Sequence, residues 1–206
     1  MTDYKKLTVD TYNKSAKELA EYFRGIGPRT DDIKRAIELA GNPKDPSILE
    51  IGCGDGRDAK EIVQLTPNYT GFDISEELIK IARADVPAGK FEVADAVTYE
   101  YPTNSLDAVF AFASLLHLDK DEVRDVLRKV YKSLREGGVF FISLKFSEAY
   151  KEELKEDKFG TRMFYFYNPE LFIELAGEGW EVAYQDKGFI TAGNTEWFEL
   201  AFRKLA

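Results

Sequence analysis

Three glycines at alternate positions, placed directly after a short apolar run, constrain the fold of this chain more than any other feature. The run at residues 48–51 predicts a buried strand, and the turn after it carries Gly52, Gly54 and Gly56. Glycine has no Cβ, so the backbone N–H groups of this turn can approach a ligand closely. A polar helix start follows at Arg57 and would present its positive N-terminal end to that ligand. The sequence therefore predicts a strand, loop and helix that hold a nucleotide-like cofactor.

The periodicity of apolar residues predicts strands that alternate with helices along most of the chain. The predicted strands are residues 48–51, 69–74, 91–94, 106–112 and 139–144, with a closing antiparallel pair at 180–184 and 197–202 joined by a short connection that contains glycine. The predicted helices are residues 14–24, a helix capped by Thr30, residues 57–65, a helix capped by Ser75, a helix from Asp119 that stops at Gly137-Gly138, and a helix opened by Asn168-Pro169. Such alternation predicts an α/β fold with a doubly wound, parallel sheet.

The spacing of the glycines separates two classes of cofactor. A dinucleotide loop has the pattern Gly-x-Gly-x-x-Gly and would need glycine where this chain has Arg57. The run Glu50-x-Gly52-x-Gly54-x-Gly56 resembles instead the first motif of class I S-adenosylmethionine (SAM) dependent methyltransferases. Residues 47–145 resemble that family's motifs in order. The resemblance implies a Rossmann-like, seven-stranded, mostly parallel sheet with one antiparallel strand near the C-terminus, SAM as cofactor and S-adenosylhomocysteine (SAH) as product.

Composition bounds the class of protein and of partner. The 206 residues, 44% of them hydrophobic, fit a single domain over residues 1–206, with residues 1–45 expected as a helical lid and first core helix. The net charge of −9 argues against a nucleic-acid substrate, because phosphate binding needs clustered lysine and arginine. No window approaches the roughly 20 apolar residues that span a bilayer, the first residues lack a secretory apolar core, and the single cysteine excludes an internal disulfide. We expect a cytoplasmic monomer or homodimer without membrane contact.

Two aspartates at predicted strand ends are the candidate ligands of adenosine. Asp73 lies 21 residues after Gly52, where an acidic side chain can accept hydrogen bonds from both ribose hydroxyls. NAD enzymes also place an acid there. By resemblance, Asp95 accepts from the adenine amino group, Ala96 offers its backbone N–H, and Ile74 packs on the ring.

The other cofactor positions follow from the resemblance as well. Tyr12 lies in a segment whose family counterpart reaches the cofactor, and Ser114 follows the fourth predicted strand beside the methionine end. Arg57 could neutralise the methionine carboxylate, although arginines at helix starts are usually solvated. The implied cofactor set in the loop and fourth strand is Glu50, Gly52, Cys53, Gly54, Arg57, Ala111 and Ser114. No set of metal ligands is predicted.

Candidates for the acceptor side come from two segments. His117 is the only histidine and has the natural pKa of a general base near neutral pH, although a structural role is the alternative. Leu115 would line the same spot. Residues 146–167 are expected to form a substrate-side insertion, in which an extended 161–167 would place Arg162 on one face and Tyr165 on the other. Both are candidate substrate contacts.

These observations predict transfer of a methyl group by direct in-line displacement to a small-molecule acceptor. One alternative is a SAM-binding protein without turnover, since cofactor motifs do not prove chemistry. The other is a nicotinamide-dependent oxidoreductase, against which the broken glycine spacing and the lack of a Tyr-x-x-x-Lys pair both argue. The acceptor molecule and the acceptor atom are not encoded in any motif.

Overall fold

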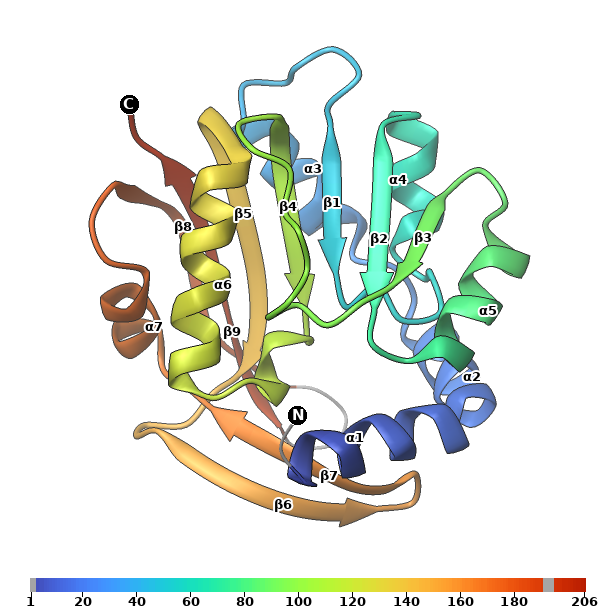
Figure 1. The fold of residues 1–206 in the computed structure, drawn as a ribbon. Coiled ribbons are helices and arrows are strands. Elements are labelled where there is room, and N and C mark those ends of the chain that lie inside the picture. Colours follow the sequence, from blue (N-terminus) through green and yellow to red (C-terminus); the bar gives the residue numbers. More distant parts are fainter. Residues whose placement is uncertain (1–2, 191–194) are drawn as a thin grey trace.

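A computed structural model describes residues 3–190 and 195–206 of the chain. Seven strands form one twisted sheet in the order β3-β2-β1-β4-β5-β9-β8 (Figure 1). Their bounds are β1 Ile48–Ile51, β2 Tyr69–Asp73, β3 Lys90–Val93, β4 Leu106–Phe112, β5 Leu134–Lys145, β8 Trp180–Ile190 and β9 Glu196–Lys204. Strands β1 to β5 are parallel, and β9 runs antiparallel to both of its neighbours. The predicted seven-stranded sheet with one antiparallel strand is confirmed.

Helices cover both faces of the sheet and give it two cores. One face packs against α3 Thr30–Leu39, α4 Ala59–Leu65 and α5 Glu76–Asp85, and the other against α6 Lys120–Ser133 and α7 Pro169–Ala176. Strand β4 is apolar along most of its length because it lies between the two cores, with Val109 and Phe110 on opposite faces and both fully buried. The order of strands reverses between β1 and β4, where open α/β sheets bind ligands at the carboxyl ends of the strands.

Local capping signals mostly predict the helix ends correctly. Ser75 caps α5 by accepting from the N–H of Leu78, Asp119 forms a full capping box on α6, and Asn168 caps α7. The prediction for Thr30 is wrong. Thr30 is the first helical residue of α3, and neither it nor Arg29 before it makes a side-chain cap.

The predicted end of α6 at Gly137-Gly138 is also wrong. The helix stops at Ser133, and both glycines lie inside β5. The reason is sheet pairing, because Leu134 already pairs with Leu106 across an irregularity in the β4–β5 register. A tertiary contact therefore ends the helix before the glycines are reached.

The N-terminus holds two helices where the sequence predicts one over residues 14–24. They are α1 Asp3–Lys14 and α2 Ala16–Ile26, separated at Ser15. Helix α1 has no apolar stripe, and its buried residues are Thr8 and Thr11. Apolar periodicity therefore could not reveal it.

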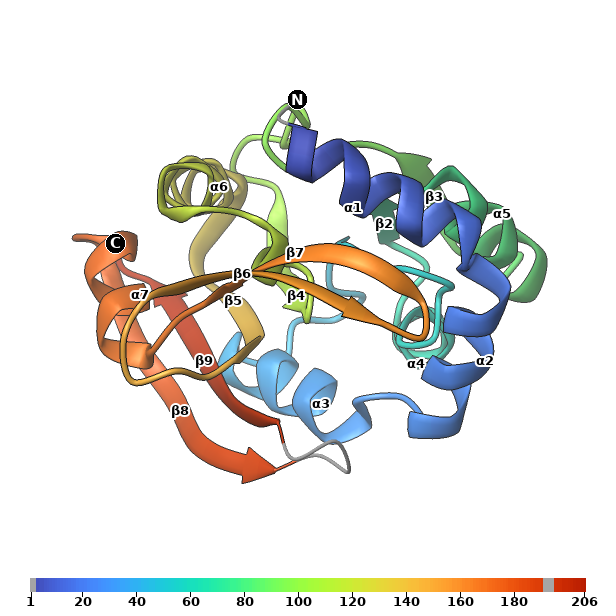
Figure 2. The ribbon, with the colours of Figure 1, turned by 90° about the horizontal axis from the view of Figure 1, so that it is seen from below.

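The polar segment after β5 also has more structure than predicted. Strands β6 Lys151–Asp157 and β7 Gly160–Phe166 form a separate hairpin, and the short helix η1 Leu115–His117 lies beneath β7. Helix α1 and the hairpin lie across the carboxyl ends of the parallel strands (Figures 1 and 2). Strands β8 and β9 extend beyond the predicted pair, and residues 191–194 of their connection lie outside the described residues. Within the described ranges, no helix is long and apolar enough to cross a membrane.

Candidate cofactor and acceptor site

The glycine loop after β1 has the left-handed backbone that glycine permits, but the N–H groups predicted to face a ligand are used within the protein. Gly52 donates to the Phe72 carbonyl, Gly54 to the Asp73 carboxylate and Gly56 to the Cys53 carbonyl. Gly52, Gly54 and Gly56 all have left-handed backbones, with φ of +70°, +56° and +79°. A Cβ at Gly52 would lie 2.3 Å from the Cβ of Ser114, so that position needs glycine for close packing. A Cβ at Gly54 would meet no protein atom within 4 Å. The backbone at Gly54 therefore faces open space, as a ligand cradle requires.

Asp73 joins this loop to the end of β2. Its carboxylate accepts hydrogen bonds from the N–H of Gly54 at 3.0 Å and from the N–H of Ser75 at 2.8 Å. Burial raises the pKa of Asp73, and the backbone N–H donors act against this shift. Each carboxylate oxygen has two lone pairs, so both can still accept from a ribose hydroxyl. Ribose binding by Asp73 stays a prediction with which these hydrogen bonds are compatible.

Ser114 lies on the other side of the loop, directly after β4. Its Oγ is buried and has no hydrogen-bond partner among the described residues. The preceding residue, Ala113, has a φ of 54°, a backbone conformation that is uncommon for residues other than glycine. A buried hydroxyl without a partner costs about 1–3 kcal/mol, so a bound ligand that supplies a partner here would be favoured. Ala111, in contrast, is fully buried within β4.

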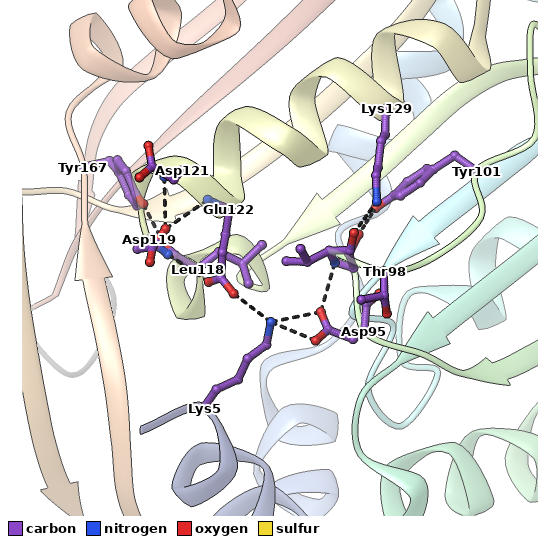
Figure 3. Close-up of polar contacts among 12 residues, drawn as sticks. Lys5, Asp95, Thr98, Tyr101, Leu118, Asp119, Asp121, Glu122, Lys129 and Tyr167 are labelled. Carbon is purple, nitrogen blue, oxygen red and sulfur yellow. Dashed lines mark hydrogen bonds and ion pairs between the residues drawn. The ribbon is translucent and has the colours of Figure 1, made fainter. Parts of the chain in front are cut away.

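Asp95, the predicted adenine ligand, is engaged by helix α1. Lys5 Nζ lies 2.8 Å from Asp95 Oδ2 and 2.9 Å from Glu122 Oε1, and so bridges the loop after β3 to the start of α6 (Figure 3). Asp95 also accepts from the N–H of Val97 at 2.9 Å. Ile74 and Ala96 are both half-buried near these strand ends. Helix α1 is thereby fastened across the predicted adenine position.

Three residues of the predicted cofactor set make contacts within the protein, under or beside the loop. Glu50 is buried and accepts from the Tyr69 hydroxyl at 2.6 Å, and burial raises its pKa well above the usual value. Burial likewise raises the pKa of the Cys53 thiol, which keeps it protonated and unreactive. The Arg57 guanidinium pairs with Asp58 at 2.6 Å. In this conformation all three support the loop from the protein side.

His117 is the centre of a hydrogen-bonded chain between α1, η1 and β7. Its Nδ1 lies 2.6 Å from the carbonyl oxygen of Met163, and its Nε2 lies 2.8 Å from the Tyr12 hydroxyl. A carbonyl can only accept, so Nδ1 carries the proton and Nε2 accepts from Tyr12. Burial lowers the pKa of His117 to about 3. The imidazole is therefore neutral, with both nitrogens occupied, and is a weak base in this conformation.

Arg162 extends the chain from the hairpin. Its Nη1 donates to the Tyr12 hydroxyl at 3.3 Å, and its other terminal nitrogen pairs with Asp157. The structure thus brings together Tyr12, His117 and Arg162, which are far apart in sequence. It places Tyr165 on the opposite face of β7, stacked on Tyr150 with ring centroids 6.4 Å apart. Leu115 is fully buried beneath them.

Helix α1 is joined to strand β7 by one hydroxyl per helical turn. Thr8 Oγ1 accepts from the Met163 N–H at 3.0 Å, and Thr11 Oγ1 donates to the Thr161 carbonyl at 2.7 Å. Ser15, which follows α1, donates to the Phe159 carbonyl at 2.7 Å. One helical turn rises about 5.4 Å and two strand residues span about 6.6 Å, so the two spacings nearly match. Helix α1 and the β6–β7 hairpin therefore form one roof over the strand ends (Figure 2).

Comparison with known proteins bears directly on this site. Residues 48–138 match a family described as a methyltransferase domain. A solved SAM-dependent methyltransferase from Clostridium acetobutylicum superposes with a TM-score of 0.71 at 14% identity, over 95% of this chain and 99% of that chain. Residues 48–138 thus resemble a methyltransferase domain in sequence, and the described chain has the fold of SAM-dependent methyltransferases. A second structure, a glycopeptide N-methyltransferase in complex with SAH, gives a TM-score of 0.66 at 16% identity, over 85% of this chain and 89% of that chain.

The methyltransferase relatives in sequence differ in what they act on. A phosphoethanolamine N-methyltransferase from Plasmodium falciparum is 28% identical over 141 residues, which cover 63% of this chain and 52% of that protein. A sterol 24-C-methyltransferase from Neurospora crassa is 35% identical over 107 residues, covering 48% of this chain and 28% of that protein. This chain thus spans about half the length of the first relative and less of the second.

The observed loop suits SAM, the cofactor of the methyltransferases that this chain resembles. The open backbone at Gly54, the strand-end carboxylate of Asp73 and the unpartnered hydroxyl of Ser114 converge on the same edge of the sheet. A hollow of about 570 Å³ at the amino ends of the strands, lined by Ile48, Tyr69 and Lys90, lies at the opposite edge from the glycines. Across the part of the chain that the structure describes, no cluster of metal-ligating side chains is found.

Two residues near the site were missed by reading the sequence. Lys5 pairs with Asp95, and Lys145 ends β5 next to the roof. Lys5 gave no signal, because α1 itself has no apolar pattern. Lys145 could have been found, since it directly follows the apolar strand predicted at residues 139–144 and so had to lie at the ligand-binding edge.

Proposed function

We propose that this chain transfers the methyl group of SAM to a small-molecule acceptor. The observation that carries the proposal is the pairing of an open glycine cradle at Gly54 with the unpartnered, buried hydroxyl of Ser114 at the switch point of the sheet. Bound SAM supplies a methyl group on a cationic sulfonium, which a nucleophile displaces in line. Relatives named for N- and C-methylation share this domain, so the acceptor atom is not carried over from them.

The residues of the chain would act by binding, orienting and excluding water. Gly54 leaves room for the cofactor because it has no side chain. Asp73 would accept from the ribose hydroxyls, and Asp95 with Ala96 and Ile74 would hold the adenine. Ser114 would hydrogen-bond the methionine end. Orientation of two reactants can supply about 7 kcal/mol or more of barrier reduction, so positioning alone accounts for much of the expected rate.

The roof formed by α1 and the β6–β7 hairpin would close the acceptor side. We propose that the roof consists of the two segments that the sequence suggests, a lid within residues 1–45 and a substrate-side insertion at residues 146–167. A roof above the strand ends must open to admit ligand and close to exclude water. His117 would act chiefly by positioning Tyr12 against the insertion, since both of its ring nitrogens are occupied. We also propose that the protein acts as a monomer or homodimer in the cytoplasm and on no nucleic acid, which the net charge of −9 supports.

Turnover of methyl-labelled SAM with pools of small metabolites tests the proposal. We expect a labelled product, identified by mass spectrometry, to form in equal amount with SAH. Binding of SAH without any labelled product would identify a SAM-binding protein that lacks turnover, and binding of NAD without SAM would overturn the assignment altogether.

A further inference from the structure

Lys145 is a half-buried lysine that faces the roof without an acidic partner. It is the last residue of β5, and its Nζ lies 3.8 Å from the ring centroid of Phe164 and 5.9 Å from that of Phe166. Within residues 3–190 and 195–206, its ammonium group takes part in none of the ion pairs or side-chain hydrogen bonds found. Burial, with the charges of Lys155 and Arg162, lowers the pKa of Lys145 to about 8, while Asp157 and Glu153 act in the opposite direction.

Arg162 brings a second cationic group to the same ring. Its Cζ lies 5.2 Å from the Phe164 centroid, and Lys145 Nζ lies 3.8 Å from the same centroid. The distance between the two cationic groups is therefore at most 9.0 Å. The side chain is almost fully buried. Its two terminal nitrogens bind Asp157 and Tyr12, but its Nε is buried without a hydrogen-bond partner in the described chain. Lysine and arginine are seldom buried unless they are paired. Among the described residues, the unpaired ammonium of Lys145 and the free Nε–H of Arg162 therefore indicate a binding place for an anion.

The position of these two residues ties them to the reaction. The N–H of Ala113 donates to the carbonyl of Ser143, so the end of β5 that carries Lys145 lies one strand, about 4.8 Å, from the segment that carries Ser114. The Phe164 ring also contacts the ring of His117, with centroids 4.9 Å apart. The cations therefore lie between the hairpin and the end of the cofactor site where the methyl group is expected.

We propose that Lys145 and Arg162 bind an anionic group of the methyl acceptor, a carboxylate or a phosphate. The rings of Phe164 and Phe166 beside them would contact the apolar body of that molecule. The acceptor is then a small organic acid or phosphate ester. This inference rests on the proposed function, and it specifies the class of substrate at the same site.

Calorimetric titration of the full chain tests the proposal with matched pairs of probes. SAH is titrated first. The SAH-saturated protein is then titrated with two matched pairs of probes: benzoate against uncharged benzamide, and phenyl phosphate against uncharged phenol. We expect each anion to bind at least tenfold more tightly than its uncharged counterpart. Lys145→Met should remove that preference while leaving the affinity for SAH within twofold. Lys151→Met is the control, because Lys151 also lies near Phe166, with Nζ 5.3 Å from the centroid, but is exposed and pairs with Glu153.

The outcomes are distinct. No preference for the charged member of either pair, or anion binding by Lys145→Met that equals the wild type, overturns the inference. Loss of turnover in Lys145→Met with a shifted pH–rate profile and unchanged anion affinity would make Lys145 a general base and also overturn it. Failure of the wild type to bind SAH refutes the proposed function instead, and titration of the free chain with the same pairs then decides whether the anion subsite exists.

Discussion

The ammonium group of Lys5 and the carboxylate of Asp95, 90 residues apart in sequence, lie 2.8 Å from one another, and both side chains are largely shielded from solvent. The same ammonium lies 2.9 Å from Glu122 (Figure 3). One residue of α1 thus links the loop after β3 to the first turn of α6. The expected adenine ligand is consequently also the point at which the roof is fastened.

Removing the ion pairs of Lys5 with Asp95 and Glu122 should change how fast a ligand leaves the site. In Lys5→Met the N-terminal end of α1 loses both ion pairs, and the roof opens more often. We expect SAH release, followed by stopped-flow fluorescence, to become severalfold faster. Lys6→Met is the matched control, because Lys6 is exposed on the same helix. Equal release rates in the wild type and Lys5→Met would show that this ion pair does not gate the site.

The buried histidine should make the folded protein sensitive to acid. The pKa of His117 is lowered to about 3 in the folded chain, against about 6.5 in an unfolded one. Between these values the unfolded state binds a proton that the folded state does not, so the free energy of unfolding falls as the pH falls through this window. The stabilising contribution is fully present above pH 6.5 and is lost toward pH 3.

The variant His117→Gln isolates this contribution, because the chain has no other histidine. Between pH 6 and pH 4 the wild type should lose about 1.4 kcal/mol per pH unit more than the variant, measured by urea unfolding at each pH. Carboxyl groups titrate in both proteins, and their effects cancel in the comparison. Parallel stability curves would mean that the imidazole is not buried as a neutral group.

The parts of the fold that could be predicted are those encoded locally. The glycine loop, the apolar strand at residues 106–112 and the caps at Ser75, Asp119 and Asn168 each depend on neighbours within a few residues. The failures arise where a tertiary contact overrides the local signal. Pairing of Leu134 with Leu106 ends α6 at Ser133, four residues before Gly137, the first residue of the glycine pair that the sequence suggests as its stop.

The roof could not be predicted for a different physical reason. Helix α1 is attached to β7 by hydroxyl-to-backbone hydrogen bonds, such as that from Thr11 to Thr161, 150 residues away. Such bonds leave no apolar periodicity in either segment. The extended conformation that the sequence analysis considered for residues 161–167 is found over Gly160–Phe166, but the side of the strand that faces the site holds Arg162, and Tyr165 packs elsewhere.

The site itself was predictable where it depends on the loop and strand ends. The positions of Asp73 and Ser114 beside the glycines follow from the order of strands and helices. The partner of Asp95 does not, because Lys5 lies on the one helix that the pattern fails to indicate. The role of His117 as a base was a guess from residue type, and its neighbours now favour positioning over proton transfer.

The central claim, that the glycine loop holds SAM, is tested most directly by calorimetric titration of SAH against Gly54→Ala. A methyl group at this position meets no protein atom within 4 Å and would occupy only the ligand cradle. The control is Gly137→Ala, where φ is also positive, at +75°, and the added Cβ is equally free of protein contacts, but the residue lies in β5 near its start. Both variants should lose about 1–2 kcal/mol of stability from the left-handed backbone. Gly54→Ala should bind SAH at least tenfold more weakly than the wild type, while Gly137→Ala should bind it equally well. Wild-type affinity in Gly54→Ala would show that the loop does not hold the cofactor.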